Sequence, residues 1–212
     1  IGRLVGRITV DDVMDEVREQ AERDYQLASG LSQDVESHDN VFRQTTARLP
    51  WLLIGMLGGI GNSMILGNFD TTFAAHPEMA LYIPLIGGTG GNVGTQSSAL
   101  VVQGLANSSL DSGNTFQQIL KESVVALINA TIISMLVYIY NFIRFGATAT
   151  VSYSVSISLF AVVMFASIFG TLVPMTLEKL KIDPAIATGP FISITNDIIG
   201  MMMYMGITVL LS

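Results

Sequence analysis

The sequence contains no cysteine, only two histidines and few charged residues. The absence of cysteine excludes disulfides and thiolate metal sites. Charged residues make up 13% of the 212 residues, whereas a soluble domain carries about 25%. Half of the residues are hydrophobic, and the mean hydropathy is +0.54. This composition is typical of a membrane protein rather than of a soluble domain.

The charged residues that are present are concentrated at the amino-terminal end. Residues 1–50 hold 16 of the 27 charged side chains, and the other 162 residues hold 11. The distribution predicts a polar segment followed by a membrane domain surrounded by lipid. The ten basic residues form no basic stripe, so we expect no nucleic-acid partner. No basic leader precedes an apolar core, so we expect no signal peptide and interpret the chain as part of a longer protein.

Apolar stretches recur along the rest of the chain, and a membrane span needs about 20 such residues. The second stretch is the weakest in hydropathy because it contains glycines and amides. We predict five transmembrane helices, at residues 50–70, 79–104, 119–143, 152–177 and 184–211.

Basic residues in the connections predict the orientation of these spans. On one side of the membrane they are Arg43, Arg48, Lys121, Lys179 and Lys181. The other side carries Arg144 alone, so we expect a cytoplasmic amino terminus and an outer carboxy terminus. An odd number of spans cannot form two equal inverted halves. A pathway lined by symmetry would therefore need a second copy of the chain, most simply in a homodimer.

The second predicted span lies in the segment YIPLIGGTGGNVGTQSSALVVQ, residues 82–103. Its glycines are Gly87, Gly88, Gly90, Gly91 and Gly94. Two pairs among them are four residues apart, a spacing that is typical of close helix packing in membranes. Packing does not explain the amides of Asn92 and Gln96. Polar groups at membrane depth face water or a protein interior, so we predict a hydrated lining next to a packing face.

The fifth predicted span carries a carboxylate, Asp197. A charge at the centre of a bilayer costs at least about 2.5–3.5 kcal/mol, so we expect this residue to have a function. Small and polar residues recur on its face at helical spacing. They are Gly189, Ser193, Asp197, Gly200, Tyr204 and Thr208, with Asn196 at the border. If Asp183 caps this helix and Pro184 begins it, Asp197 lies about 21 Å along it, past the middle of the membrane.

No lysine or arginine lies at a depth comparable to that of Asp197, so we expect no salt bridge within the chain. The carboxylate could be protonated, or it could face a cation in a water-filled passage, where two copies would converge in a dimer. Carboxylate, amide and hydroxyl oxygens, with no cysteine or histidine in the spans, suit a hard cation such as Mg²⁺.

Several alternatives to a Mg²⁺ channel remain open at this point. Mn²⁺ or Co²⁺ could be the main substrate, and a carrier coupled to protons or Na⁺ could replace a channel. An intramembrane aspartyl protease needs two buried carboxylates, whereas we expect one per chain and the G-x-G-D signature is absent. A serine protease would need a buried histidine base, and no predicted span contains one.

Three motifs resemble the membrane domain of the MgtE family of magnesium channels. They are PLIGGTGGNVGTQSS (84–98), KES (121–123) and KIDPAIATGPFISITNDIIG (181–200). The segment LVGRITVDDVMDEV (4–17) resembles the last strand and helix of the CBS-domain pair in this family, with Thr9 and Asp12 in the pattern of a capping box. The resemblance implies an all-α membrane protein with the end of a CBS-like domain at 1–17, a connecting plug helix at 18–48 and a five-helix pore domain at 49–212.

The resemblance also implies a function that is not enzymatic. A homodimer in the cell membrane would carry Mg²⁺ down its gradient through a pore between the second and fifth spans. Asp197 would be the principal Mg²⁺ contact, Ser193 would contribute its backbone carbonyl and Asn92 its amide. Gly189 falls where other members can have asparagine.

The resemblance further implies regulation by cytoplasmic Mg²⁺ bound at acids of the plug region. Asp24 matches such a position, but Gln20 and Arg23 stand where acids are expected. Amino-terminal regulatory domains would precede this segment in the full-length protein. We therefore predict that Mg²⁺-dependent closure is weak in this chain.

Overall fold

A computed structural model describes residues 6–32, 35–107, 115–146 and 150–211. These residues form helices and connections, with no strand among them, so the prediction of an all-α chain is confirmed for this part. The long helices are α1 (Val10–Ala28), α2 (Val41–Gly67), α4 (Ile83–Ala106), α5 (Thr115–Phe145), α6 (Thr150–Lys179) and α7 (Pro190–Leu211). The short segments are α3 (Asp70–Ala75) and the 3₁₀ turns η1 (Pro77–Tyr82) and η3 (Pro184–Ala187).

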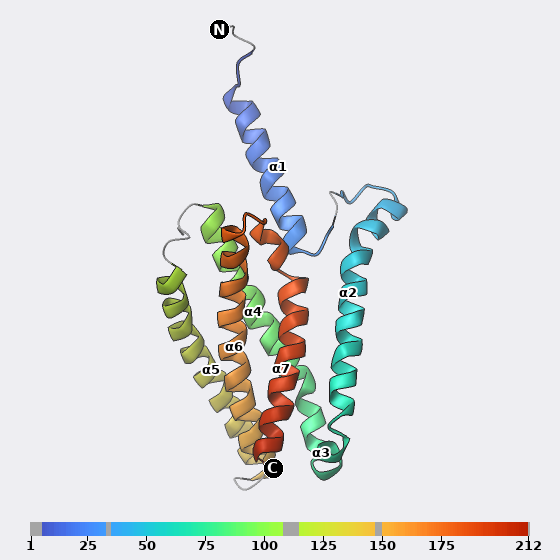
Figure 1. Cartoon of the computed structure of the whole chain (residues 1–212), viewed down its shortest axis with the longest axis vertical. Coiled ribbons are helices and arrows are strands. Elements are labelled where there is room, and N and C mark those ends of the chain that lie inside the picture. The colour runs from blue at the N-terminus through green and yellow to red at the C-terminus, as the bar shows by residue number, and fades with distance from the viewer. Residues whose placement is uncertain (1–5, 33–34, 108–114, 147–149, 212) are drawn as a thin grey trace.

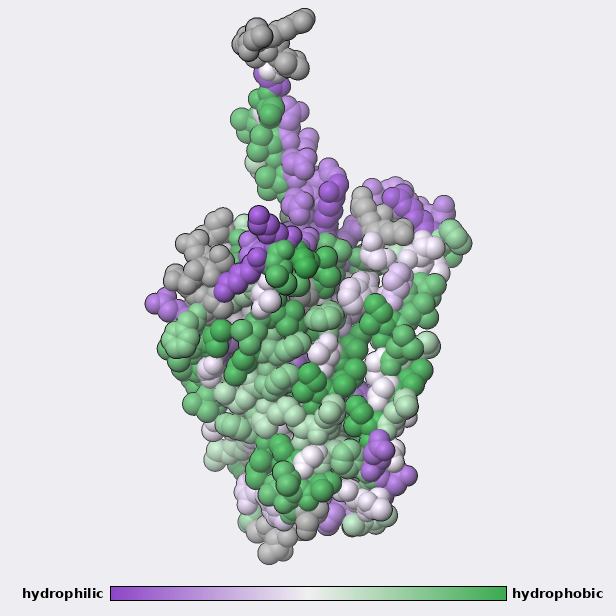
Figure 2. All heavy atoms as spheres, viewed as in Figure 1, coloured by the Kyte–Doolittle hydropathy of each residue, from purple (hydrophilic) through white to green (hydrophobic). Residues whose placement is uncertain are grey.

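Four of the described helices, α2, α5, α6 and α7, are long and apolar enough to cross a membrane. Figure 2 shows hydrophobic residues over the body of the bundle and hydrophilic residues on one side of α1 and on the bundle end next to it. The chain is therefore a membrane protein. α4 has 24 residues, which is long enough for a span, but it is not among these four. Five spans thus remain a prediction.

The helix α6 is the centre of the bundle. It packs against α4, α5 and α7, and its buried side chains form much of the core. Figure 1 shows α5 at one edge of the bundle and α2 at the other, where α2 contacts α7. α1 projects from one end of the bundle and contacts η3, while the carboxy terminus lies at the opposite end.

Two glycines allow the backbones of α4 and α6 to touch. A Cβ atom built on Gly170 of α6 would lie 2.3 Å from the carbonyl oxygen of Gly94 on α4. This distance is far below a van der Waals contact, and the oxygen can move only if the helix moves with it. Small residues permit such close approach between membrane helices. Gly170 therefore sets the spacing between α4 and the central helix.

We expect Gly170→Ala to destabilise the folded chain, because overpacking typically costs about 1–3 kcal/mol. Gly206→Ala on α7 is the matched control, since no atom of another described element lies within 4 Å of its Cβ position. The control should match or slightly exceed the wild type in stability, because alanine is favoured over glycine in helices by about 1 kcal/mol. Thermal unfolding of the purified protein in detergent measures both variants. An unchanged unfolding temperature for Gly170→Ala would contradict the packing described here.

The amino-terminal region differs from the single connecting helix predicted for residues 18–48. α1 ends at Ala28, and α2 begins at Val41, before the start at residue 50 that hydropathy predicts. The predicted capping box is confirmed: Thr9 Oγ1 accepts a hydrogen bond from the N–H of Asp12, and the Asp12 side chain accepts one from the N–H of Thr9. Residues 6–9 form no strand, and residues 4–5 of the expected strand lie outside the described residues.

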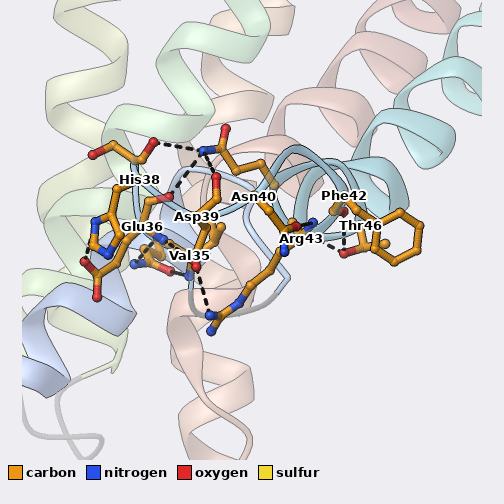
Figure 3. Close-up of polar contacts among 11 residues, drawn as sticks. Val35, Glu36, His38, Asp39, Asn40, Phe42, Arg43 and Thr46 are labelled. Carbon is orange, nitrogen blue, oxygen red and sulfur yellow. Dashed lines mark hydrogen bonds and ion pairs between the residues drawn. The ribbon is translucent and has the colours of Figure 1, made fainter.

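The early start of α2 is explained by the side chains in Figure 3. Asn40 Oδ1 accepts a hydrogen bond of 2.8 Å from the N–H of Arg43 and so caps the helix. Asparagine is among the best N-cap residues. Arg43 also pairs with Asp39 at 3.0 Å, and the N–H of Glu36, which donates to Asp39, lowers the pKa of that carboxyl. These polar contacts explain why α2 begins before its apolar stretch.

The predicted fifth span is divided into two segments. The Asp183 side chain accepts a hydrogen bond from the N–H of Ala185 and so acts as an N-cap, as predicted. The segment that it caps, however, is the short 3₁₀ turn η3. The backbone then takes an extended conformation at Thr188 and a left-handed one, with φ +55°, at Gly189. α7 starts only at Pro190. The prediction of one continuous helix from residue 184 is therefore wrong.

Candidate cation site

Asp197 lies in the first half of α7, about 10 Å along the helix from Pro190. The predicted depth of about 21 Å from Asp183 is wrong, because the intervening backbone is not one helix. The Asp197 side chain is partly buried. Within the described part of the chain, no hydrogen bond or ion pair reaches its carboxylate. The protein thus places an unpartnered carboxyl group inside a helix that is apolar enough to span a membrane.

The glycines of α4 face this carboxylate. A Cβ atom on Gly87 would lie 3.6 Å from Asp197 Oδ1, and one on Gly91 would lie 3.3 Å from the same oxygen. The Cβ position of Gly91 is also 2.8 Å from the hydroxyl oxygen of Ser193. Gly87 faces Asp197, whereas the later Gly91 also faces the earlier Ser193. The two helices therefore run antiparallel here. The structure therefore brings together Asp197, Ser193, Gly87 and Gly91, which the sequence analysis had selected.

Other small residues selected from the sequence pack helices together. A Cβ atom on Gly94 would be 1.8 Å from the amide nitrogen of Asn196 and would displace it. The Cβ positions of Gly90 and Gly200 both lie against Val162 of α6, at 2.9 and 3.2 Å. Asn196 is 1% exposed, and in the described residues neither its oxygen nor its nitrogen has a hydrogen-bond partner. These residues lie in the packed interior between α4, α6 and α7.

Two amides of the second predicted span, Asn92 and Gln96, were selected from the sequence. They are four residues apart and therefore lie on the same side of α4, and Asn92 is exposed there. Gln96 lines a pocket between α4 and α5, together with Ser97 and Glu122. Gln96 of the predicted lining therefore lies in this pocket rather than beside Asp197.

Gly189 lies at the turn before α7 rather than on the face of Asp197. Its Cβ position is 2.1 Å from the carbonyl oxygen of Ala28 at the end of α1. A side chain would therefore meet backbone, and the left-handed φ also favours glycine. Its own carbonyl oxygen accepts a 3.0 Å hydrogen bond from the N–H of Ser193. The close approach of Gly189 to Ala28 is a structural reason for glycine at this position, which we predicted to contact the ion.

Asp24 of α1 lies in a separate pocket of about 410 Å³ where α1 meets η3. It accepts a 2.8 Å hydrogen bond from the side chain of Gln20. Asp183 and Glu178 line the same pocket. The helix contact thus brings acids from two parts of the chain to one place, and their regulatory role remains a prediction.

Sequence reasoning missed the burial of Glu122 on α5. This side chain is 8% exposed and lies within a helix that is long and apolar enough for a span. The expectation of one buried carboxylate per chain is therefore wrong. The available signal was an acid near the start of an apolar run, and beside Lys121 this position resembles a helix end exposed to water.

The side-chain oxygens that meet at Gly91 are those of the Asp197 carboxylate and the Ser193 hydroxyl. The described residues contain no group of three or more histidine, cysteine, aspartate or glutamate side chains that could hold a metal ion. One chain therefore offers a single carboxylate here, which suits a cation that keeps most of its water.

The comparison with protein families agrees with this chemistry. The MgtE family, described as a divalent cation transporter, matches residues 83–207. This chain belongs to the MgtE family. The matched range covers α4 to α7 and therefore includes the Asp197 site and Glu122.

Three curated relatives carry the same name, magnesium transporter MgtE. The relative from Bacillus subtilis is 33% identical over 204 residues, which are 96% of this chain and 45% of the relative. The relative from Thermus thermophilus is 32% identical over 216 residues (99% and 47%), and that from Enterococcus faecalis is 30% identical over 205 residues (96% and 45%). The chain thus spans less than half the length of these relatives. The family and the relatives are described as transporters, so the comparisons support neither of the two protease alternatives.

Proposed function

We propose that this chain forms a pore for Mg²⁺ across the cell membrane, as a homodimer in which Asp197 of each copy faces the ion. The observation that carries this proposal is the partly buried Asp197 carboxylate, which lies against Gly87 and Gly91 of α4 and has no hydrogen-bond or ion-pair partner among the described residues. An isolated charge at this depth is costly unless a cation or water compensates it. Mg²⁺ is the ion named in all three relatives.

The homodimer is part of this proposal because one chain offers too few charges at Asp197. Two copies related by a two-fold axis would bring two carboxylates to one ion and neutralise its charge. Asn92, which is exposed on α4, would then face the passage as well. The exposed apolar side chains of α2 and α5 would face lipid or the second copy.

We also propose that α4 crosses the membrane together with α2, α5, α6 and α7, which gives five spans. It packs along α6 and α7, both of which are apolar enough to cross the bilayer. Its glycines and amides lower its hydropathy, as is tolerated where a helix lines a cavity or packs against protein. In this arrangement the amino terminus is cytoplasmic and the carboxy terminus is outside. Residues 1–17 would end a CBS-like domain, 18–48 would connect it, and 49–212 would form the pore domain.

Uptake of Mg²⁺ by proteoliposomes that contain the purified chain tests the proposed function. A fluorescent Mg²⁺ indicator inside the vesicles should report an influx that vesicles without protein lack. Vesicles whose influx equals that of protein-free vesicles, with the protein shown to be inserted and folded, would overturn the proposal.

We expect the ion to be bound through its water. Mg²⁺ gives up water reluctantly, and one carboxylate per chain with amides and hydroxyls is too sparse a set to replace six waters. Hexaamminecobalt(III), whose ligands do not exchange, should therefore compete with Mg²⁺ and block uptake. Asp197→Ala should weaken binding of the complex. Unaltered uptake in the presence of the complex, or Asp197 oxygens at about 2.1 Å from the metal in a structure, would contradict outer-sphere binding.

A further inference from the structure

A second carboxylate is buried in the membrane part of the bundle, on the opposite side of α4 from α7. Glu122 of α5 is 8% exposed. Its Oε1 atom accepts a 2.6 Å hydrogen bond from the hydroxyl of Ser97 on α4 and another from the hydroxyl of Ser167 on α6. The two hydroxyl oxygens lie 3.0 Å apart. Three helices are thus joined at one carboxylate oxygen.

The second oxygen of this carboxylate is unpartnered. Across the described ranges, neither a hydrogen bond nor an ion pair reaches Glu122 Oε2. Lys121 lines the same pocket as Glu122, yet the two side chains form no ion pair. The two serine hydroxyls orient the carboxylate but supply no positive charge. Among the described residues, the carboxylate is therefore bound by neutral hydroxyls and pairs with no cationic side chain.

Glu122 lines a pocket of about 510 Å³ between α4 and α5, which we call the Glu122 pocket. Amide side chains dominate the polar part of its lining. They are Gln96, Gln103, Asn107, Gln118 and Asn129. Amide and carboxylate oxygens are ligands for hard cations. Six waters need about 180 Å³ at about 30 Å³ each, so the pocket is large enough for a hydrated ion.

We propose that the Glu122 pocket binds a divalent cation, separately from the Asp197 site. Glu122 Oε2 supplies the charge, and the amides hydrogen-bond the waters of the ion. Ser97 lies about 9 Å along α4 from Gly91, on the side of α4 that faces α5 and α6 rather than α7. A cation here would hold α5 against the helix whose other face borders Asp197. The inference concerns binding alone and does not depend on the proposed pore.

Binding of Mn²⁺, a paramagnetic probe for divalent sites, tests this proposal in the purified full chain. Electron paramagnetic resonance reports free Mn²⁺, so the number of bound ions per chain follows from a titration. The comparison is made in an Asp197→Ala background to remove the other site. Glu122→Gln should lower the number of bound Mn²⁺ by one ion per chain, and Mg²⁺ should displace that ion. Glu122→Gln keeps an oxygen that accepts from both serines, so the helix junction is preserved.

The matched control is Glu16→Gln, an exposed acid on α1 that should leave the number of bound ions unchanged. An equal number of bound Mn²⁺ with and without Glu122→Gln would overturn the proposal and leave Glu122 a structural residue. A second measurement needs no variant: anomalous scattering from crystals of the unmodified chain grown with Mn²⁺ should show a peak in the Glu122 pocket. Saturating Mn²⁺ with no peak there would also overturn it.

Discussion

Asp197→Ala is expected to abolish Mg²⁺ uptake by proteoliposomes while the protein remains inserted and folded. The carboxylate has no partner within the described residues, so its removal breaks no contact inside the chain. Hydrogen bonds to charged groups contribute about 1.5–3 kcal/mol each. Losing one from each of two copies would cost about 3–6 kcal/mol at the ion site. Since 1.4 kcal/mol is a factor of ten, uptake should fall on the order of a hundredfold or more.

Two further variants separate charge from shape at this position. Asp197→Asn keeps the size and one oxygen but loses the charge, so it should also be severely impaired. Asp70→Asn, which neutralises an exposed acid at the start of α3, should transport like the wild type. Uptake by Asp197→Ala at the wild-type rate would remove this residue from the ion's path.

Gly91→Leu is expected to block uptake by filling the space beside the carboxylate. Even a Cβ atom at this position would lie 2.8 Å from the hydroxyl oxygen of Ser193 and 3.3 Å from Asp197 Oδ1. The remaining carbons of leucine would displace α4 from α7 or cover the carboxylate. Either result should reduce uptake to the level of Asp197→Ala, and the proteoliposome assay measures it.

Gly59→Leu on α2 is the matched control, because this glycine is exposed and, in the part of the chain that the structure describes, no other element lies within 4 Å of its Cβ position. The control should keep its uptake. Cross-linking of the two copies then distinguishes a blocked passage from a failure to assemble. Intact dimers of Gly91→Leu with intact uptake would show that the glycine is merely tolerated there.

The packing face of α4 and the functional acid of α7 could each be predicted from sequence because their determinants are local, whereas the pairing of the two helices was implied only by the family resemblance. Glycines spaced four apart predict a face for close packing, and a lone acid in an apolar run predicts a functional site. Asp197 and Gly91 satisfy these rules, and the structure places them side by side. The capping box at Thr9 was equally predictable, because all of its atoms lie within one turn.

The break before α7 could not be predicted by the same means. Hydropathy continues from Pro184 into α7, and a glycine in that run reads as part of the helix face. Gly189 is instead required where its backbone meets the end of α1, far away in the sequence. A rule based on periodicity does not include such a distant contact, so the start of α7 and the depth of Asp197 were both misplaced.

Glu122 was missed because its partners come from two other helices. Ser97 and Ser167 are unremarkable in their own segments, and only the packing of α4, α5 and α6 brings their hydroxyls to one oxygen. Gln96 was assigned to the Asp197 lining for a related reason, since the sequence does not show which face of α4 meets which neighbour. Both the burial of Glu122 and the location of Gln96 depend on tertiary contacts between helices.

Planar-bilayer recording of the purified chain, with Mg²⁺ as the only permeant cation, tests the central claim most directly. The account predicts discrete current steps carried by Mg²⁺, and no steps from Asp197→Ala protein reconstituted in parallel at the same density. Discrete openings would also exclude a coupled carrier. Current steps of equal size and frequency in the Asp197→Ala protein, or Mg²⁺ uptake without any steps in the wild type, would contradict a pore lined by Asp197.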